Sequence, residues 1–305
     1  MNNKLPDFLL NKLNNQYGED ITNKIINGYC EKKVTIRINT LKTSKEEVCN
    51  ILEKNNIQYK EVTRNNIALI IENANEETLS KLEIYEKGYI YLQSLSSMLP
   101  PIILQPQESE DILDMTAAPG SKTTQIAAIT KNRANITAYE MNKIRADRLK
   151  YNLQKQGANS VVVINEDSRK MSDYFAFDRI LLDAPCSGSG TVNLQNEKTY
   201  KNITKELIQK TRKSQLALLK KALKILKPGH EMVYSTCSIL REENEDIINQ
   251  VINNQDIEIV PININEDIPK LPCRIKEAIC IAPNEYYEGF FVAKLKKKKI
   301  KENGF

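Results

Sequence analysis

Two cysteines come directly after predicted strands and are candidates for catalytic chemistry. Residues 178–183 form a strand-like run that continues into Ala184-Pro185-Cys186, and residues 231–236 form a second run that continues into Cys237. In open α/β sheets the ligand crevice lies outside the carboxyl ends of the strands, so both thiols and the Asp183 carboxylate are expected there. Thiols in that position predict nucleophilic chemistry. The other cysteines are interpreted as inert, buried side chains: Cys30, Cys49, Cys273 and Cys280.

The single histidine, His230, restricts how such a nucleophile can be activated. One histidine argues against a Ser-His-Asp triad and excludes a His-rich metal site, so we expect no bound metal. The cysteines form no CxxC pair and are expected to be reduced thiols of a cytosolic protein. Because a free thiol is only a few per cent ionised at neutral pH, a catalytic cysteine needs activation from another group.

A turn of small residues between a predicted strand and a predicted helix indicates a ligand site. It follows the strand-like run 111–115 and opens a helix near 120–130. Small side chains let a ligand approach the backbone, and the free amides at the start of the helix can take a carboxylate. The turn lacks the three glycines of a dinucleotide fingerprint, so a pyrophosphate is not implied. The candidate ligand-binding residues are Thr116, Ala117, Ala118, Pro119, Gly120, Ser121 and Lys122.

Acidic side chains at the ends of neighbouring strands indicate that the ligand is a nucleoside. Glu140 ends the next strand and is placed to accept from the two ribose hydroxyls. Asp167 follows the third strand and could accept from an adenine amino group, while Asp183 ends the fourth. Arg145 is a lesser candidate contact. Any one of these acids alone would read as a surface carboxylate, but their joint position beside the turn favours a nucleoside.

Short apolar runs alternate with amphipathic stretches through residues 96–305, which predicts βαβ units. Strands are expected at 111–115, 135–140, 160–164, 178–183, 231–236 and 289–295. Helices are expected near 120–130, 142–156, 205–226 and 242–253, with Gly157 and Pro228-Gly229 as stop signals. The predicted fold class of this domain is α/β, with a doubly wound, mostly parallel, Rossmann-like sheet.

Residues 1–95 are predicted to form a separate, small α+β domain. Strands at 34–38, 57–62, 67–71 and 88–92 alternate with helices at 44–55 and 76–81 in the order βαββαβ. That order is typical of ferredoxin-like and RRM-like modules, although the Gly-aromatic signature of an RNA-stacking RRM is missing. The sequence has no Gly/Ser-rich linker, so we expect a packed junction around residues 93–101.

Composition and charge restrict the partners. Hydrophobic residues make up 41% and charged residues 27% of the chain, as in ordinary globular proteins. No apolar run approaches about 18 residues, and the first residues lack a secretory signal, so we expect a cytoplasmic protein that does not cross a membrane. The net charge of +5 is concentrated: nine basic residues and one acid lie between Lys201 and Lys227. This segregation fits either a polyanionic partner or a solvated helix face.

The motifs around the turn and the two thiols resemble one enzyme family. Ala117-Ala118-Pro119-Gly120-Ser121-Lys122-Thr123, Asp183-Ala184-Pro185-Cys186-Ser187-Gly188 and Ser235-Thr236-Cys237-Ser238 resemble the Nop/Sun (Rsm-type) family of RNA cytosine-5 methyltransferases. Residues 37–42, 93–98 and 288–293 add weaker matches, so the resemblance covers nearly the whole chain. The run from Ala118 is most similar to bacterial ribosomal RNA members. Some members carry a further C-terminal RNA-binding or N-terminal NusB-like domain, and from the length of 305 residues we expect neither here.

The resemblance implies an S-adenosyl-L-methionine-dependent enzyme and a role for each thiol. Cys237 would add to carbon 6 of the cytosine, and Cys186 would help to remove the carbon 5 proton or to release the enzyme. Because DNA cytosine-5 methyltransferases place their nucleophile in a Pro-Cys motif like Pro185-Cys186, the sequence chemistry alone leaves the two roles open. Asp183 is placed to hydrogen-bond or protonate ring nitrogen 3. Lys122 is one candidate for activating the thiol, although an ordinary helix lysine is an equal interpretation.

Other functions fit the sequence less well. A nucleotide- or RNA-binding module without catalysis would not need the Cys186–Cys237 pair. An amino-methyltransferase would carry a Pro and an aromatic residue after Pro185, where this chain has Cys186 and Ser187. DNA remains a lesser alternative to RNA. We expect ribosomal RNA as the substrate, with transfer RNA as the alternative, and a monomeric enzyme.

Overall fold

A four-stranded antiparallel sheet forms one end of the molecule. The computed structural model describes residues 5–63, 65–252, 256–264 and 266–299, and within them the small sheet has the order β2-β3-β1-β4. Its strands are β1 (Thr35–Ile38), β2 (Tyr59–Val62), β3 (Asn65–Ile71) and β4 (Ile90–Leu92). Helices α3 (Lys45–Lys54), α4 (Glu76–Ser80) and α5 (Glu83–Glu86) complete the unit, and the predicted Ser44 cap accepts from Glu47 N at 3.2 Å. The predicted ferredoxin-like βαββαβ order is confirmed.

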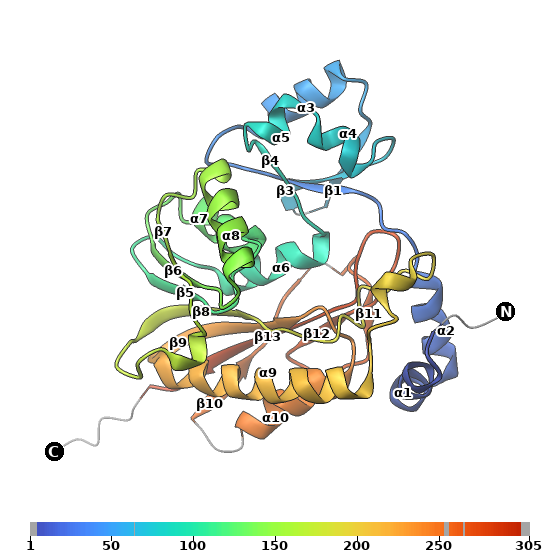
Figure 1. Ribbon diagram of the computed structural model, residues 1–305, viewed down its shortest axis with the longest axis vertical. Coiled ribbons are helices and arrows are strands. Elements are labelled where there is room, and N and C mark those ends of the chain that lie inside the picture. The colour runs from blue at the N-terminus through green and yellow to red at the C-terminus, as the bar shows by residue number, and fades with distance from the viewer. Residues whose placement is uncertain (1–4, 64, 253–255, 265, 300–305) are drawn as a thin grey trace.

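A larger mixed sheet forms the centre of the molecule (Figure 1). The strands β5 (Asp111–Asp114), β6 (Asn135–Tyr139), β7 (Val161–Ile164), β8 (Phe177–Asp183) and β9 (Leu226–Thr236) run parallel. Antiparallel strands extend it beyond β9: β10 (Ile257–Val260), β11 (Lys270–Leu271), β12 (Ile279–Ile281) and β13 (Phe290–Lys297). The order is β11-β12-β13-β9-β8-β5-β6-β7, with β10 also paired to β13.

Helices cover both faces of this sheet, so the predicted doubly wound, Rossmann-like class is confirmed. On one face α6 (Leu95–Leu104), α7 (Ser121–Ile129) and α8 (Lys143–Gln156) pack in a cluster with Ile112 and Leu181. On the other face α9 (Lys205–Ile225) and α10 (Glu245–Ile252) pack in a cluster with Leu113 and Leu182. Consecutive side chains of a strand point to opposite faces of the sheet. Ile112 and Leu113 of β5 are therefore both buried, one under each helix layer, and so are Leu181 and Leu182 of β8. This part of the chain therefore has the two hydrophobic layers of an α/β fold.

Two helices at the start of the described chain pack against the large sheet. They are α1 (Asp7–Tyr17) and α2 (Glu19–Gly28), which the sequence analysis did not predict. The Tyr17 hydroxyl donates to Ile239 O at 2.6 Å, and the Tyr29 hydroxyl donates to Ser189 O at 2.6 Å. Residues 5–29 therefore share a core with the large sheet, although they precede the small sheet in the sequence. The domain division after residue 95 remains a prediction.

The junction between the sheets is packed, as expected. Arg37 of β1 is 1% exposed, and its guanidinium donates to Gln93 Oε1 at 2.7 Å, Ser121 O at 2.5 Å and Thr124 Oγ1 at 2.8 Å. These contacts attach the small sheet to the start of α7. The α6 helix fills the junction and is capped by Ser94, which accepts from Ser97 N at 3.3 Å.

The remaining differences from the expected elements are local. Strand β9 begins at Leu226, five residues earlier than expected, and its register with β8 shifts between Phe177 and Arg179. Pro228-Gly229 therefore follows the end of α9 at Ile225, as expected, but lies within β9. A short 3-10 turn, Arg241–Glu243, precedes α10, and residue 253 of the expected helix lies outside the described residues. Among the described helices, none has the length and apolar character that a membrane span needs.

Candidate active site

The turn between β5 and α7 is fixed by contacts to three neighbouring strands or helices. Ala117 N donates to Tyr139 O at 2.9 Å, and the Thr116 hydroxyl donates to Asp183 O at 2.8 Å. Gly120 caps α7 with φ +108°, and a Cβ there would lie 2.9 Å from Leu149 Cδ1 of α8. Glycine at this position therefore permits the close approach of α8, as well as the backbone conformation.

The strand-end acids predicted from the sequence lie around the turn. Glu140 is 4% exposed, and its carboxylate accepts from Asn142 N at 2.8 Å and lies 3.6 Å from Arg145 Nη1. Arg145 also donates to Ala118 O at 2.8 Å. Asp167 accepts from the guanidinium of Arg169 at 2.6 Å, and this hydrogen bond lowers the pKa of Asp167. Arg169 was not predicted as a site residue. It lies in the 3-10 turn two residues after Asp167, and no spacing in the sequence indicates that its side chain folds back onto that carboxylate.

A cavity of about 260 Å³, here called the first cavity, brings most of the predicted residues together. Its lining includes the following predicted residues: Thr116, Ala118, Glu140, Arg145, Asp167, Asp183, Cys186 and Cys237. Met115, Met141 and Leu218 add apolar surface. Carboxylates and apolar side chains in one cavity suit a nucleoside. Its ribose hydroxyls and amino group donate hydrogen bonds, and its base has a flat apolar surface.

A second cavity, of about 430 Å³, lies beside the first. It is bounded by the small sheet, the start of α7 and the chain before β13, and Asp183 and Cys237 line both cavities. Pro119, Ser121 and Lys122 line the second cavity and not the first, whereas Ala117 and Gly120 line neither. The two cavities therefore meet at one carboxylate and one thiol.

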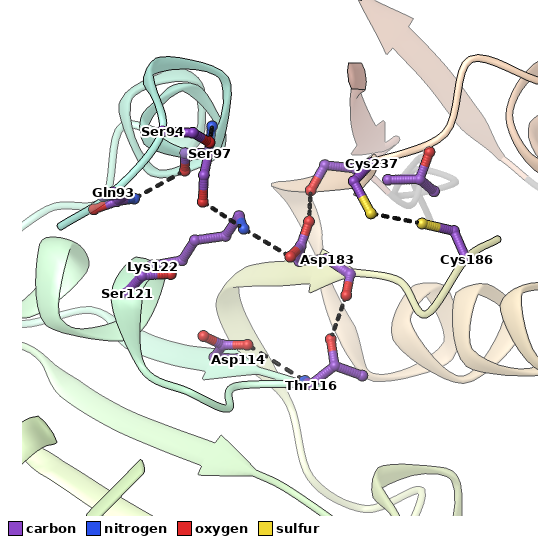
Figure 2. Close-up of polar contacts among 12 residues, drawn as sticks. Gln93, Ser94, Ser97, Asp114, Thr116, Ser121, Lys122, Asp183, Cys186 and Cys237 are labelled. Atoms are coloured by element: carbon purple, nitrogen blue, oxygen red, sulfur yellow. Dashed lines mark hydrogen bonds and ion pairs between the residues drawn. The ribbon is translucent and has the colours of Figure 1, made fainter. Parts of the chain in front are cut away.

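The two predicted thiols lie in contact (Figure 2). Cys186 Sγ and Cys237 Sγ are 3.0 Å apart, and both cysteines are free and half-buried. The hydrogen bond to Cys237, followed by burial and the charges of Cys237 and Glu243, raises the pKa of Cys186 well above its usual range. Of the cysteines interpreted as structural, Cys280 is buried, whereas Cys30, Cys49 and Cys273 are half-buried. None of these four lines either cavity.

Asp183 is held by an ion pair and a hydroxyl (Figure 2). Its carboxylate lies 2.7 Å from Lys122 Nζ and accepts from Ser235 Oγ at 2.7 Å. Lys122 also donates to Ser97 Oγ at 2.9 Å. Burial alone would lower the pKa of Lys122, but the charge and hydrogen bond of Asp183, together with the charge of Cys237, raise it. The ammonium therefore stays charged beside both Asp183 and Cys237.

Glu243 supports the loop that carries Cys186, and the sequence analysis did not identify it. Its buried carboxylate accepts from Ser187 N at 2.8 Å, Ser187 Oγ at 2.5 Å and Thr211 Oγ1 at 2.7 Å. In the sequence it stands in the charged run Arg241-Glu242-Glu243-Asn244-Glu245, which is typical of an exposed helix start.

Asp114, at the end of β5, is also a buried carboxylate. Burial raises its pKa to about 6 despite hydrogen bonds from Thr123 and Thr116.

The arrangement places two free thiols in contact and a carboxylate held by Lys122 and Ser235 where the two cavities meet. Among the described residues, no group of three or more His, Cys, Asp and Glu side chains is placed to hold a metal ion. The carboxylate and the two thiols are side chains that can carry acid–base and nucleophilic chemistry.

Family models match both parts of the chain. The model described as "16S rRNA methyltransferase RsmB/F" matches residues 101–296, which is more than half of the chain. The model described as "Methyltr_RsmF/B-like, ferredoxin-like domain" matches residues 5–76. The second match includes α1 and α2 together with the first strands of the small sheet.

Relatives named for different RNAs are similar to this chain. The ribosomal RNA small subunit methyltransferase F of Shewanella piezotolerans is 34% identical and aligns with 86% of this chain and 57% of its own length. The tRNA (cytosine(49)-C(5))-methyltransferase of Pyrococcus abyssi is 33% identical and aligns with 89% of this chain and 90% of its own length. Several relatives are longer: the chain spans 38% to 62% of the length of four of them.

A solved structure shares the whole fold. The crystal structure of NSun6 from Pyrococcus horikoshii with SFG has a TM-score of 0.86 and 25% identity, over 97% of this chain and 99% of its own. Because the alignment covers 97% of this chain, the similarity extends over both the small sheet and the large sheet. Together with the two family models, it shows that the chain belongs to the RsmB/F family of 16S rRNA methyltransferases.

Proposed function

We propose that the chain transfers a methyl group from S-adenosyl-L-methionine to carbon 5 of a cytosine in RNA, through a covalent cysteine adduct. The observation that carries the proposal is the meeting of two cavities at Asp183 and Cys237, with Cys186 Sγ 3.0 Å from Cys237 Sγ. A methyl donor in the first cavity and a base in the second would both reach this point.

The first cavity has the side chains that S-adenosyl-L-methionine requires. Glu140 would accept from the ribose hydroxyls, Asp167 from the adenine amino group, and the backbone around Thr116 and Ala118 would face the amino-acid part. The bound donor would supply an electrophilic methyl group on a sulfonium. The SFG in the Pyrococcus horikoshii structure is an analogue of this donor, which supports the same cofactor here.

Cys237 and Cys186 would carry out different steps on the base, addition at carbon 6 and removal of the proton at carbon 5. The Cys237 thiolate adds to carbon 6 of cytosine, which makes carbon 5 nucleophilic enough to take the methyl group. The carbon 5 proton then leaves, the sulfur–carbon 6 bond breaks, and the thiolate of Cys237 is restored. Cys186, whose pKa is raised, would first pass its own proton to solvent, and its thiolate would then take the carbon 5 proton as the sulfur–carbon 6 bond of Cys237 breaks.

Asp183 and Lys122 would act on the other edge of the ring. The carboxylate of Asp183, oriented by Lys122 and Ser235, would accept a hydrogen bond from ring nitrogen 3 once that nitrogen has taken up a proton in the adduct, which stabilises the adduct. The charged Lys122 would also stabilise the negative charge on the Cys237 sulfur as it adds to the base and as it leaves. This gives the nucleophile an activating group in a chain with a single histidine.

The substrate proposed is ribosomal RNA, methylated in the cytoplasm, and the alternative is transfer RNA. Ribosomal RNA follows from the matched family model and the Shewanella relative. Transfer RNA is favoured by one observation, that the Pyrococcus abyssi tRNA enzyme is matched over 90% of its length. Target bases must leave their stack to enter the second cavity, so loops and single strands are the expected context.

The test combines cofactor binding with methylation. Titration calorimetry should show one molecule of S-adenosyl-L-methionine bound per chain, with weaker binding by Glu140→Ala. Unmodified ribosomal RNA incubated with the protein and a methyl-labelled donor should yield 5-methylcytosine on nuclease digestion and mass spectrometry. Absence of donor binding would overturn the methyltransferase assignment, and label in transfer RNA alone would select the alternative substrate.

A further inference from the structure

A third cavity, of about 400 Å³, lies between the small sheet and α8, and is here called the α8 groove. It shares Tyr91, Leu92 and Pro119 with the second cavity, so it continues from the space where the target base is proposed to bind. No residue of the catalytic group formed by Lys122, Asp183, Cys186 and Cys237 lines it.

Aromatic rings and cations line the α8 groove. Tyr85 and Tyr91 come from the small domain, and Arg148, Tyr151 and Lys155 come from α8. The three α8 residues are separated by three and four positions, so they lie on one face of the helix. The described residues that line the groove include no carboxylate. The groove therefore combines flat apolar surface with positive charge, of which Lys155 also interacts with the charge of Glu86 outside the lining.

Two of the three tyrosine rings that line the groove contact other side chains, whereas the third has no such contact among the described residues. Tyr91 has Arg37 5.2 Å from its ring centroid and accepts a hydrogen bond from Asn152 Nδ2 at 3.3 Å. Tyr85 has Lys155 Nζ 3.4 Å from its ring centroid. Tyr151 is 62% exposed and has neither a hydrogen bond nor a ring contact among the described residues. Arg148 is also exposed and has no ion pair among those residues.

We propose that the α8 groove binds the nucleotides next to the target cytosine in a single-stranded segment of the RNA. A flanking base stacks on Tyr151, and Arg148 neutralises a phosphate beside it. The inference rests on the proposed function, because it takes the RNA chain to continue from the second cavity. Aromatic stacking with a basic surface is the usual way in which proteins hold single strands without reading their sequence.

Fluorescence anisotropy with a labelled RNA tests the groove directly. The probe is a single-stranded oligonucleotide of about 12 nucleotides, uridines with one central cytosine, long enough to cover both sites. Tyr151→Ala should weaken binding roughly tenfold, while Tyr151→Phe, which keeps the ring, should bind like the wild type. Arg148→Gln should weaken binding and reduce the slope of log affinity against log salt by roughly 0.7, the value for one single-strand phosphate contact.

Tyr174→Ala is the matched control, since this side chain is fully exposed and lines none of the three cavities. It should bind RNA like the wild type, and all variants should keep the wild-type affinity for S-adenosyl-L-methionine. Unchanged RNA binding in both Tyr151→Ala and Arg148→Gln would overturn the inference, as would an equal loss in Tyr151→Phe and Tyr151→Ala. A wild-type protein that binds neither probe nor donor would instead overturn the proposed function.

Discussion

The contact between Cys186 and Cys237 requires one of the two sulfurs to keep a proton. Two thiolates 3.0 Å apart would repel each other strongly, and the pKa of Cys186 is raised by its hydrogen bond to Cys237 and by burial. The raised pKa of Cys186 therefore favours a proton on Cys186 when the two sulfurs are in contact. Lys122 reinforces this division, because its charge lies close enough to Cys237 for the two to interact.

This division predicts opposite behaviour for the two cysteine variants. Cys237→Ala should abolish methylation and form no covalent complex with RNA, because the nucleophile is gone. Cys186→Ala should still add to the base but release it slowly, because removal of the carbon 5 proton is impaired. A denaturing gel with substrate RNA should show a retarded protein–RNA band for Cys186→Ala and none for Cys237→Ala.

A third thiol provides the control for this experiment. Cys49→Ala, in the small domain and outside both cavities, should methylate RNA like the wild type. A retarded band for Cys237→Ala and none for Cys186→Ala would reverse the assigned roles and match the DNA enzymes. If neither variant gives a band, RNA containing 5-fluorocytosine and the wild-type protein would show whether an adduct forms at all.

The sequence predicted the residues that stand at strand ends but not those that support them. Asp183, Cys186 and Cys237 could be found because a parallel sheet places the carboxyl ends of its strands at one edge. Glu243 and Ser97 could not, since their contacts join segments 56 and 25 residues apart and depend on how α6 and α9 pack. Such contacts leave no periodic pattern in the chain.

At the scale of elements, the loop that carries Cys186 is clamped between β9 and the start of β13. Gly190 N donates to Cys237 O at 2.9 Å, and Gly289 N donates to Gly190 O at 2.8 Å. A Cβ on Gly190 would lie 1.9 Å from Gly289 O, so the two backbones meet where a side chain cannot fit. The clamp sets the separation of the two thiols.

Gly190→Ala should therefore damage both stability and activity. Because the overlap is with backbone, the expected cost is about 3 kcal/mol, which would lower Tm by roughly 6–12 °C. Methylation should fall even well below the new Tm, since Cys186 and Cys237 are displaced relative to each other. Thermal denaturation and initial-rate assays on the same preparations measure the two effects.

Gly157→Ala separates this steric effect from backbone strain. Gly157 ends α8 with φ +69°, and an added Cβ would meet only the flexible side chain of Lys42. The expected cost is about 1–2 kcal/mol from the left-handed conformation, with activity retained. A stable and fully active Gly190→Ala protein would show that the clamp does not position the thiols.

Elements with a clear period were predictable, and those shaped by packing were not. The ferredoxin-like order and the parallel strands followed from alternating apolar runs. Helix α6 was not predicted because Pro100 and Pro101 signal the end of a helix, yet its apolar residues are buried in the junction. The α1 and α2 helices carry buried residues such as Leu9, Leu13 and Ile25, but the core that they join includes distant segments: Tyr17 bonds to Ile239, 222 residues away.

At the scale of the whole molecule, three cavities form a continuous series along the junction of the two sheets. The α8 groove shares Tyr91 and Leu92 with the second cavity, and the second cavity shares Asp183 and Cys237 with the first. The small domain therefore contributes walls to the two cavities in which RNA is proposed to bind. Helix α9 packs on the opposite face of the large sheet (Figure 1).

This arrangement changes the expectation for the basic segment between Lys201 and Lys227. Lys221 and Lys224 both pair with Asp173, at 2.5 and 2.6 Å, and Lys227 pairs with Asp178 at 2.9 Å. Part of the charge concentration seen in the sequence is thus neutralised within the fold. Exposed charges farther from the RNA than the Debye length of about 8 Å are largely screened at physiological salt.

Salt dependence should therefore separate two pairs of lysines. Lys32 and Lys33 line the second cavity, whereas Lys213 and Lys220 are exposed on α9. Each double substitution to Gln removes the same charge, so either serves as the control for the other.

If RNA enters through the second cavity, loss of Lys32 and Lys33 should reduce the slope of log affinity against log salt by about 1.4, at roughly 0.7 per single-strand phosphate contact. Loss of Lys213 and Lys220 should leave the slope near that of the wild type. A flatter slope for the α9 variant alone would show that RNA crosses the α9 face, as the charge pattern of the sequence allowed.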